Sequence, residues 1–312
     1  MLERNVPLNR YVHWKIGGSA DYFCEPKDAA ELIAAVKEAR LLGVPVFVLG
    51  GGTNILVSDK GFRGLVIRPA FGAIRREGNA IVADAGVSVE KLLDFAGASG
   101  LAGLEWAGGL PGTLGGAIRG NAGAFGGEIK DSVREVVSID TADFELRTVR
   151  RTNAECRFGY RSSIFKEKGT EVVLEATLVL TPGDPAEITK IGESRSSYRK
   201  ERHPIEYPNA GSIFKNVPVG AFTPELRAKL APVVKNDPFP VVPTAYLISE
   251  AGMKGTRVGG AEVSPKHPNF IVNVGGATAA DVESLISAVK EKVKEKFGIP
   301  LEEEIMRLGE LR

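Results

Sequence analysis

Length, composition and charge exclude several classes of protein. The 312 residues exceed what one hydrophobic core usually organises, about 250 to 300 residues, so we expect two or three domains. The 40 Lys and Arg nearly balance the 39 Asp and Glu, which argues against a nucleic-acid or membrane-surface partner and favours a small-molecule partner.

The cysteine, histidine and apolar content indicates the expected cellular compartment and argues against a disulfide or a metal site. Cys24 and Cys156 are far apart and lie outside any C-x-x-C spacing, so we expect reduced thiols rather than a disulfide. Three histidines are too few for a His-rich metal site, and we expect no metal. No apolar run approaches the ~20 residues of a membrane helix, and no signal segment is evident. We expect a cytoplasmic monomer.

The first third of the chain predicts an opening β-α-β unit with a looped insert. Asp28 is a typical N-cap and Gly43 a typical C-cap of a helix between them. Strands are predicted at 44–49 and 65–67, with a glycine-rich insert between them.

The middle of the chain predicts a β-rich region. A strand at 80–85 precedes a helix that Ser88 caps and that runs to Ser99. The glycine-rich segment 104–127 has no helical or strand period, and such long irregular segments usually serve a site. Further strands are predicted near 133–139, 144–149 and 171–180.

The last third alternates helices and strands. The predicted elements are a helix over 186–202 ended by Pro204, a helix over 245–251, strands at 258–263 and 270–274, and a helix over 278–297. Thr278 and Asp281 form a variant capping box at the start of that last helix. Soft domain boundaries are expected near residues 68, 196 and 299.

Two glycine runs offer backbone amides to an anion. Gly50, Gly51 and Gly52 directly follow a predicted strand, although a plain turn explains a triple glycine equally well. Neither a Walker loop nor a Rossmann fingerprint matches this run. A second run over 108–117 contains Pro111 and Thr113. Two such loops suit a long diphosphate ligand.

Three short segments carry candidate chemistry beside an ordinary structural reading. Arg161 follows Tyr160 and could clamp a carboxylate, or be a surface turn residue. Ser212 could be a turn or cap serine, since a hydroxyl donates a proton only to a strongly basic centre. The acidic run 302–304 could be a solvated turn. The basic run Arg199, Lys200, Arg202 and His203 suits a diphosphate or a solvated helix end.

The order of these motifs resembles one enzyme family. The runs GGGTNILVSD at 50–59 and LPGTLGGA at 110–117, the following NAGA at 121–124, and the later motifs are similar to UDP-N-acetylenolpyruvoylglucosamine reductases from Asn9 to about Gly309. The resemblance implies an α+β, three-domain flavoprotein with a vanillyl-alcohol-oxidase (PCMH) type FAD-binding fold and a C-terminal α/β substrate domain. The implied ranges are 1–68 with 300–312 returning near it, 69–195, and 196–299, with the PCMH-type module over about 17–182.

The same resemblance implies an activity and its residues. It implies NADPH-dependent reduction of UDP-N-acetylglucosamine enolpyruvate to UDP-N-acetylmuramate, a peptidoglycan precursor, through non-covalent FAD. The implied catalytic residues are Arg161, Ser212 as proton donor, and Glu304. The implied FAD-binding residues are Gly50, Gly51, Gly52, Thr53, Asn54, Ile55, Gly112, Thr113, Gly115, Ala122 and Gly123. The implied substrate-binding residues are Tyr160, Arg202, Lys215, Asn216, His267 and Asn269.

The sequence departs from the family pattern at two positions. Phe125 stands where tyrosine is common, and Met306 where an arginine is common, with an arginine one position later at Arg307. Only 51 positions separate Arg161 from Ser212, which resembles the shorter, type II branch and implies a more open substrate site.

Two other functions remain open from the sequence. One is an FAD oxidase or dehydrogenase of the same fold that acts on another sugar or alcohol. The other is a non-catalytic protein that binds a flavin or a sugar nucleotide.

Overall fold

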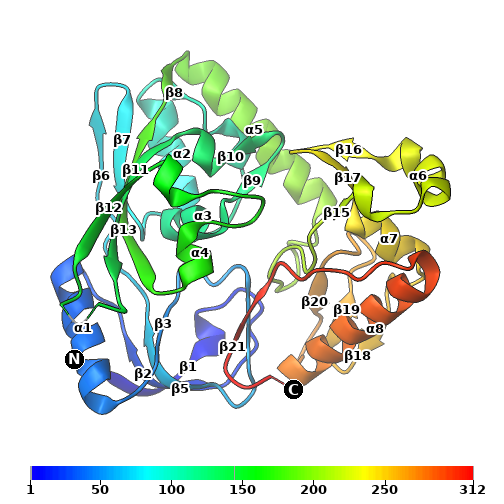
Figure 1. Cartoon of the computed structure of the whole chain (residues 1–312), viewed down its shortest axis with the longest axis horizontal. Helices are drawn as coiled ribbons and strands as arrows, with labels where there is room; N and C mark the ends of the chain where they lie inside the picture. Colours follow the sequence, from blue (N-terminus) through cyan, green and yellow to red (C-terminus); the bar gives the residue numbers. More distant parts are fainter. Residues whose placement is uncertain (1, 144, 312) are drawn as a thin grey trace. The chain divides into compact units, whose positions relative to one another are not determined.

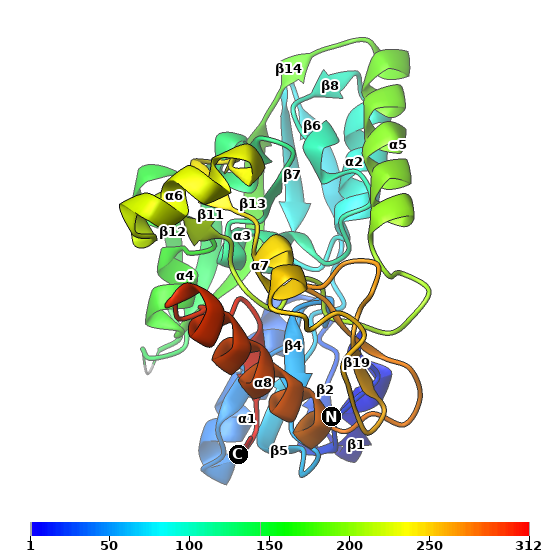
Figure 2. The same ribbon diagram turned by 90° about the vertical axis from the view of Figure 1, so that its right-hand side faces the viewer.

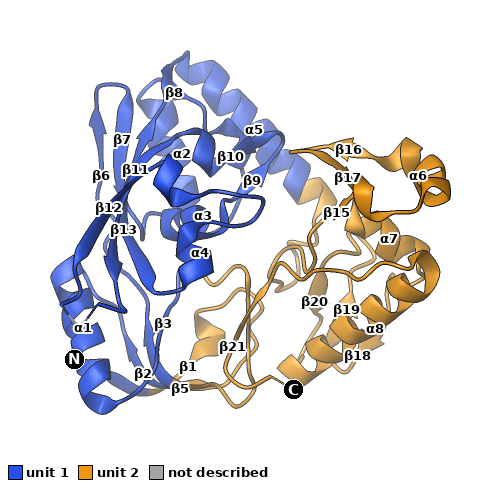
Figure 3. Ribbon diagram, in the orientation of Figure 1, with its two compact units in different colours: residues 1–4, 21–51, 64–199 blue, residues 5–20, 52–63, 200–312 orange. Residues whose placement is uncertain are grey.

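The computed structural model describes residues 2–143 and 145–311 (Figure 1). Two compact units divide the chain: unit 1 comprises residues 1–4, 21–51 and 64–199, and unit 2 comprises 5–20, 52–63 and 200–312 (Figure 3). Residues 1, 144 and 312, which fall in the predicted domain 1–68, strand 144–149 and segment 300–312, lie outside the described residues. The division into three domains stays a prediction.

The opening helix of unit 1 has the predicted caps. Helix α1 spans Ala29–Leu42, the Asp28 side chain accepts a hydrogen bond from the backbone of Glu31, and Gly43 ends the helix in the left-handed region at φ 66°. The predicted strand 44–49 is shorter in the structure, because only Val46–Val48 (β3) pairs, in parallel, with β5. The four-stranded sheet has the order β1-β2-β5-β3, with β1 Glu3–Pro7, β2 Ser19–Cys24 and β5 Phe62–Ile67.

An antiparallel five-stranded sheet of order β12-β11-β13-β7-β6 forms the centre of unit 1. Its strands are β6 Ile74–Glu77, β7 Ala80–Asp84, β11 Val133–Asp140, β12 Thr148–Thr152 and β13 Glu171–Val179. The strands predicted near 80–85, 133–139 and 171–180 are confirmed. Strand β6 was not predicted, because its polar sequence IRRE is that of an exposed edge.

The strand predicted near 144–149 lies later in the chain, at Thr148–Thr152. The side chain of Asp140 accepts from the backbone of Ala142, and that of Asp143 accepts from the backbone of Glu145, so aspartates organise a turn there. Leu146 adopts a left-handed backbone at φ 54°. The strand therefore begins only at Thr148, opposite Ile139.

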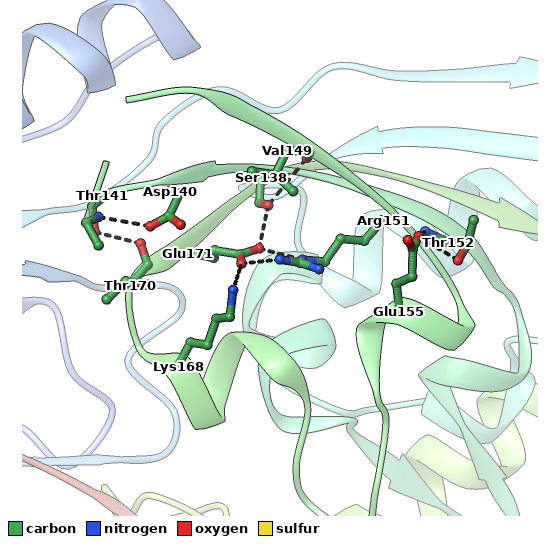
Figure 4. A network of polar contacts seen from close by, with 11 residues as sticks. Ser138, Asp140, Thr141, Val149, Arg151, Thr152, Glu155, Lys168, Thr170 and Glu171 are labelled. Carbon is green, nitrogen blue, oxygen red and sulfur yellow. Dashed lines mark hydrogen bonds and ion pairs between the residues drawn. The ribbon is translucent and has the colours of Figure 1, made fainter. Parts of the chain in front are cut away.

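A buried carboxylate ties three strands of this sheet together (Figure 4). Glu171 accepts from Arg151 Nε at 2.7 Å, from Lys168 Nζ at 3.1 Å and from Ser138 Oγ at 3.1 Å. Its side chain is fully buried. The hydrogen bonds from Arg151 outweigh burial and lower the pKa of Glu171 to about 2.

Helix α2 confirms the prediction made for its segment. It spans Val89–Ala98, with the Ser88 hydroxyl accepting from the backbone of Lys91 and Ser99 at its C-cap. The remaining unit 1 elements are β8 Leu101–Ala102, β9 Gly123–Ala124, β10 Gly127–Glu128, α4 Ile164–Lys168, β14 Thr181–Pro182 and α5 Pro185–Arg202, whose last three residues belong to unit 2.

The segment 104–127 contains a helix that the sequence did not predict. Helix α3 spans Leu114–Gly120 and packs against β13 (Figure 1). Its buried residues Leu114, Ala117 and Ile118 have helical spacing, but three glycines among seven residues hide the period. The side chain of Thr113 caps the helix by accepting from Gly116 at 3.4 Å.

The core of unit 1 contains both cysteines. Cys24 and Cys156 are free and buried. Burial raises the pKa of each thiol to about 11, so both stay protonated and unreactive near neutral pH.

Unit 2 contains two small antiparallel sheets and a long helix. The sheets are β15-β17-β16 (Val217–Pro218, Pro240–Val242, Lys235–Asn236) and β18-β19-β20 (Arg257–Val258, Ala261–Val263, Ile271–Asn273). Figure 2 shows helix α8, Ala279–Phe297, along β19. The predicted capping box is confirmed, since Thr278 and Asp281 each accept from the other's backbone.

Three further unit 2 elements complete the description. Helix α6 spans Pro224–Leu230, and α7 spans Thr244–Glu250, as predicted for 245–251. Strand β21, Met306–Leu308, pairs in parallel with β4, Ile55–Val57. The predicted strand 258–263 is split at Gly260, where a Cβ would lie 2.2 Å from the carbonyl oxygen of Gly275. Among the described residues no helix is both long and apolar enough to cross a membrane.

Candidate functional site

The two glycine runs meet in unit 1. A Cβ on Gly51 would lie 2.8 Å from the Cα of Gly112, and one on Gly50 would lie 2.8 Å from Thr113 Oγ1. Only glycine permits this approach of backbone to backbone. The structure therefore brings together Gly50, Gly51, Gly112, Thr113 and Gly115, since Thr113 caps α3 and Gly115 lies in the first turn of that helix.

The amides at this meeting point fit a diphosphate. Within the described residues, the backbone N–H groups of Gly50, Gly51 and Gly112 donate to no protein acceptor. Unpaired backbone donors without side chains form the kind of concave site that binds phosphoryl oxygens. The residues present thus fit the diphosphate of FAD.

The rest of the first glycine run belongs to unit 2. Gly52 has φ 65°, and a Cβ there would lie 2.2 Å from the carbonyl oxygen of Tyr11. Asn54 Nδ2 donates to the backbone carbonyl of Glu304 at 3.2 Å, and the backbone carbonyl of Asn54 accepts from the N–H of Met306 at 3.0 Å. Asn54 therefore holds the acidic segment in place, and Ile55 begins the strand β4 that pairs with β21.

A tight turn presents Ser212. The side chain of Asn209 accepts from the N–H of Gly211 at 3.0 Å, and Gly211 takes φ 76°. Ser212 follows, half-buried, and its hydroxyl has no hydrogen-bond partner among residues 2–143 and 145–311. An Asx turn and a left-handed glycine thus leave this hydroxyl available for a ligand.

Backbone pairing brings Glu304 beside Ser212. The N–H of Glu304 donates to the carbonyl of Ile213 at 2.8 Å, and the N–H of Lys215 donates to the carbonyl of Glu302 at 2.9 Å. Two of the three predicted catalytic residues, far apart in sequence, are therefore neighbours in unit 2.

Asn269 and Asn216 support the Ser212 segment. Asn269 is 3% exposed, and its amide accepts from the N–H of Phe214 at 3.0 Å and donates to the Phe214 carbonyl at 2.8 Å. Asn216 Oδ1 accepts from the N–H of Thr244 at 3.1 Å. Both side-chain amides form hydrogen bonds with backbone groups and so hold the neighbouring segments in place. The sequence did not predict this role.

The acidic run divides into different roles. Glu302 is 70% exposed and pairs with Lys215. Glu303 is only 12% exposed and pairs with Lys290 and Arg307, so the reading of a solvated turn is wrong for it. Arg307 also makes two 2.9 Å hydrogen bonds to Glu283 on α8, and these contacts raise its pKa.

Arg161 lies at the tip of a tight turn in unit 1. Gly159 and Ser162 exchange backbone hydrogen bonds of 3.0 and 3.1 Å, which force Arg161 into a left-handed backbone at φ 54°. Its Nη2 donates to the carbonyl of Gly123 at 2.8 Å, and its guanidinium lies 5.1 Å from the centre of the Tyr160 ring. Non-glycine residues in this conformation are concentrated at functional sites.

The contact with Gly123 joins Arg161 to the predicted FAD-binding residues. The N–H of Ala122, the residue before Gly123, donates to the carbonyl of Ala117 on α3 at 2.8 Å. Arg161, Ala122 and Gly123 therefore lie together beside the helix that follows the second glycine run.

The predicted basic run 199–203 is not one cluster. Arg199 belongs to unit 1, where its Nε donates to the carbonyl of Gly108 at 2.9 Å. Arg202 is exposed and pairs with Glu201 at 3.3 Å, and His203 packs against His267 with ring centres 5.2 Å apart. Burial lowers the pKa of His267 to about 4, so its imidazole is neutral at pH 7.

The structure also brings together residues that the sequence analysis missed. Arg195 and Arg199 on α5 both face the ring of Phe125, with guanidinium carbons 4.6 and 5.3 Å from its centre. Their spacing of four residues places them on one face of the predicted helix. The sequence does not show that Phe125 packs against this face, so the two arginines could equally have been solvated.

Fold and site together define a flavoprotein oxidoreductase. Residues 20–149 match the sequence family described as FAD binding domain, and residues 203–308 match UDP-N-acetylenolpyruvoylglucosamine reductase, C-terminal domain. These matches confirm the expected α+β fold, with a PCMH-type FAD-binding part and a C-terminal domain.

The chain belongs to the UDP-N-acetylenolpyruvoylglucosamine reductase family. It is 39% identical to the enzyme of that name from Solibacter usitatus, over 98% of this chain and 96% of that protein. It is 41% identical to the one from Caldanaerobacter subterraneus, over 98% and 93%. The crystal structure of the reductase from Thermus caldophilus matches with a TM-score of 0.77 and 31% identity, over 99% of both chains.

Proposed function

We propose that this chain reduces UDP-N-acetylglucosamine enolpyruvate to UDP-N-acetylmuramate, with NADPH as the source of electrons. The observation that carries the proposal is the Ser212 hydroxyl of a chain of this family, which lies beside Glu304 and has no hydrogen-bond partner among the residues that the structure describes. FAD bound to this chain would supply hydride transfer from NADPH to the terminal carbon of the enolpyruvyl double bond.

The two glycine runs and the residues that follow them hold FAD. The unpaired amides of Gly50, Gly51 and Gly112 bind the diphosphate, and Thr113, Gly115, Ala122 and Gly123 line the adjoining backbone. Gly52, Thr53, Asn54 and Ile55 continue the same binding segment, with Asn54 also fixing Glu304.

Ser212 supplies the proton. Addition of hydride to the terminal carbon leaves negative charge on the neighbouring carbon and its carboxylate. Such a centre is basic enough to take a proton from an alcohol, so Ser212 Oγ donates its proton to that carbon.

Arg161 and Glu304 act on the carboxylate. The guanidinium of Arg161 binds the enolpyruvyl carboxylate and stabilises the charge that develops on it, while Glu304 polarises the same group. Tyr160, Arg202, Lys215 and His267 complete the substrate-binding set, which Asn216 and Asn269 support through their hydrogen bonds to backbone. The enzyme acts as a cytoplasmic monomer of the type II branch.

Single-turnover kinetics of Ser212→Ala test this assignment. NADPH should bleach the flavin of the variant at the parental rate, while the return of flavin absorbance on adding substrate should slow roughly 10²- to 10⁴-fold, the range of general acid catalysis. Ser284→Ala, an exposed serine on α8, is the matched control and should behave as the parent. Parental turnover by Ser212→Ala would contradict the proposal.

A further inference from the structure

Two arginines of α5 carry positive charge that no acidic side chain balances among the described residues. Arg195 and Arg199 are one helical turn apart, and both guanidinium groups lie over the Phe125 ring. In the described part of the chain neither forms an ion pair with a carboxylate. Like charges at this spacing destabilise a helix, so the pair has a cost that the fold alone does not offset.

The surroundings of Arg199 disfavour its charge. Burial and, to a smaller extent, the positive charge of Arg161 together lower the pKa of Arg199 to about 10. The ring of Phe125 attracts a cation only weakly compared with a carboxylate. Three arginines therefore share one region of unit 1.

Three buried N–H groups in this region have no acceptor among the described residues. They are Arg195 Nε, Arg199 Nη2 and Trp106 Nε1, and Trp106 is 9% exposed. A buried donor without a partner costs about 1 to 3 kcal/mol, so native proteins rarely leave several together. Three donors with no acceptor form the complement of an anion.

Glycine contacts link the segments that carry the three donors. A Cβ on Gly109 would lie 3.2 Å from Arg199 Cδ, and one on Gly108 would lie 3.0 Å from Arg195 Cβ. A Cβ on Gly127, two residues after Phe125, would lie 2.5 Å from Trp106 Cδ1. The loops that carry Trp106 and Phe125 therefore pack together, and the glycines after Trp106 pack against α5.

We propose that Arg195, Arg199 and the indole N–H of Trp106 form a binding site for a phosphoryl group. Guanidinium groups match phosphoryl oxygens in geometry and remain charged at physiological pH, and an indole supplies a donor only. This site rests on the proposed function, in which the glycine runs hold the diphosphate of FAD, so the phosphoryl group at the arginines belongs to NADPH or to the sugar nucleotide.

Calorimetric titration of the FAD-loaded enzyme with inorganic pyrophosphate tests the site. Arg195→Gln and Arg199→Gln should each weaken binding roughly 10- to 100-fold, as expected for the loss of a charge-assisted contact. Trp106→Phe, which keeps an aromatic ring and removes the donor, should weaken it roughly tenfold. Lys190→Gln removes an exposed charge from the same helix and should bind as the parent does.

Two KM values distinguish the source of the phosphoryl group. A selective rise in the KM for NADPH or in the KM for the sugar nucleotide, restored by Arg195→Lys, identifies the ligand, while the FAD retained per chain should stay parental. Pyrophosphate binding by Arg195→Gln at parental affinity would overturn the site. A lowered Tm with equal loss of all three properties would also overturn it, because the arginines would then only support Phe125. Pyrophosphate binding needs no turnover, so failure of the proposed reaction leaves this test intact.

Discussion

At the scale of single residues, Asn269 determines where Ser212 lies. Its amide makes two hydrogen bonds to the backbone of Phe214, and its own carbonyl accepts from the N–H of Ile213 at 2.8 Å. One buried side chain therefore fixes the segment that carries the proposed proton donor.

Asn269→Ala should lower both stability and activity. The variant leaves two buried backbone groups of Phe214 without partners, at a cost of about 2 kcal/mol or more in the free energy of unfolding. Urea denaturation should show this loss, and flavin reoxidation by substrate should slow while FAD content stays parental. The exposed Asn236→Ala on β16 serves as control. Parental reoxidation in Asn269→Ala would show that the bracing is not needed.

Glu171 links a single residue to the stability of the sheet. Its pKa lies at about 2 in the folded protein, against an ordinary 4.5, chiefly because of the hydrogen bonds from Arg151. A carboxyl with a lowered pKa stabilises the fold above its unfolded pKa, and this contribution disappears as the pH falls from about 4.5 toward 2.

Glu171→Gln should therefore lower stability in a pH-dependent manner. The difference in free energy of unfolding between parent and variant should be about 2 kcal/mol at pH 7 and should shrink between pH 5 and pH 2. Glu135→Gln, which breaks an exposed pair with Arg150, should change stability by less than about 1 kcal/mol. A difference that stays constant with pH would contradict the role given to the Glu171 ion pair.

At the scale of elements, the meeting of the two glycine runs builds the proposed FAD site. The close approach of Gly51 to Gly112 exists only because neither residue has a side chain. A loop after β3 and a loop before α3 thereby present their amides together.

Gly51→Ala should weaken FAD binding. A Cβ at 2.8 Å from the Gly112 backbone must separate the two loops, and such overpacking corresponds to roughly a tenfold or greater loss of affinity. The ratio of flavin absorbance to protein after purification measures it. Gly72→Ala, where a Cβ would meet nothing within 4 Å, should retain parental flavin. Equal flavin content in both variants would contradict the predicted FAD site.

Helix ends were predictable from sequence because their signals are local. Asp28, Ser88 and Thr278 each cap the helix expected after them. Helix α3 was missed because glycines hide its period, and the start of β12 was misplaced because aspartate turns delay the strand.

The candidate site was only partly predictable. The order of the motifs predicted Arg161, Ser212 and Glu304 as catalytic residues. The hydrogen bonds between Asn269 and Phe214 join residues 55 positions apart, so they leave no local pattern in the sequence. The pairing of Ile213 with Glu304 is equally non-local. Contacts of this kind become visible only in the folded chain.

At the scale of the whole molecule, residues of both units serve the proposed reaction. Unit 1 contains Gly50, Gly51, the second glycine run and Arg161, and unit 2 contains Ser212 and Glu304. The family matches cover both parts, over 20–149 and 203–308. Because cofactor binding and protonation use different residues, reduction of the flavin by NADPH and its reoxidation by substrate can each be measured separately.

An anaerobic two-step absorbance measurement tests the proposed reaction most directly. NADPH should bleach the visible absorbance of the purified yellow protein, and UDP-N-acetylglucosamine enolpyruvate should then restore it, with one UDP-N-acetylmuramate formed for each NADPH consumed. A colourless purified protein, or a bleached protein whose colour the sugar nucleotide does not restore, would contradict the proposed function.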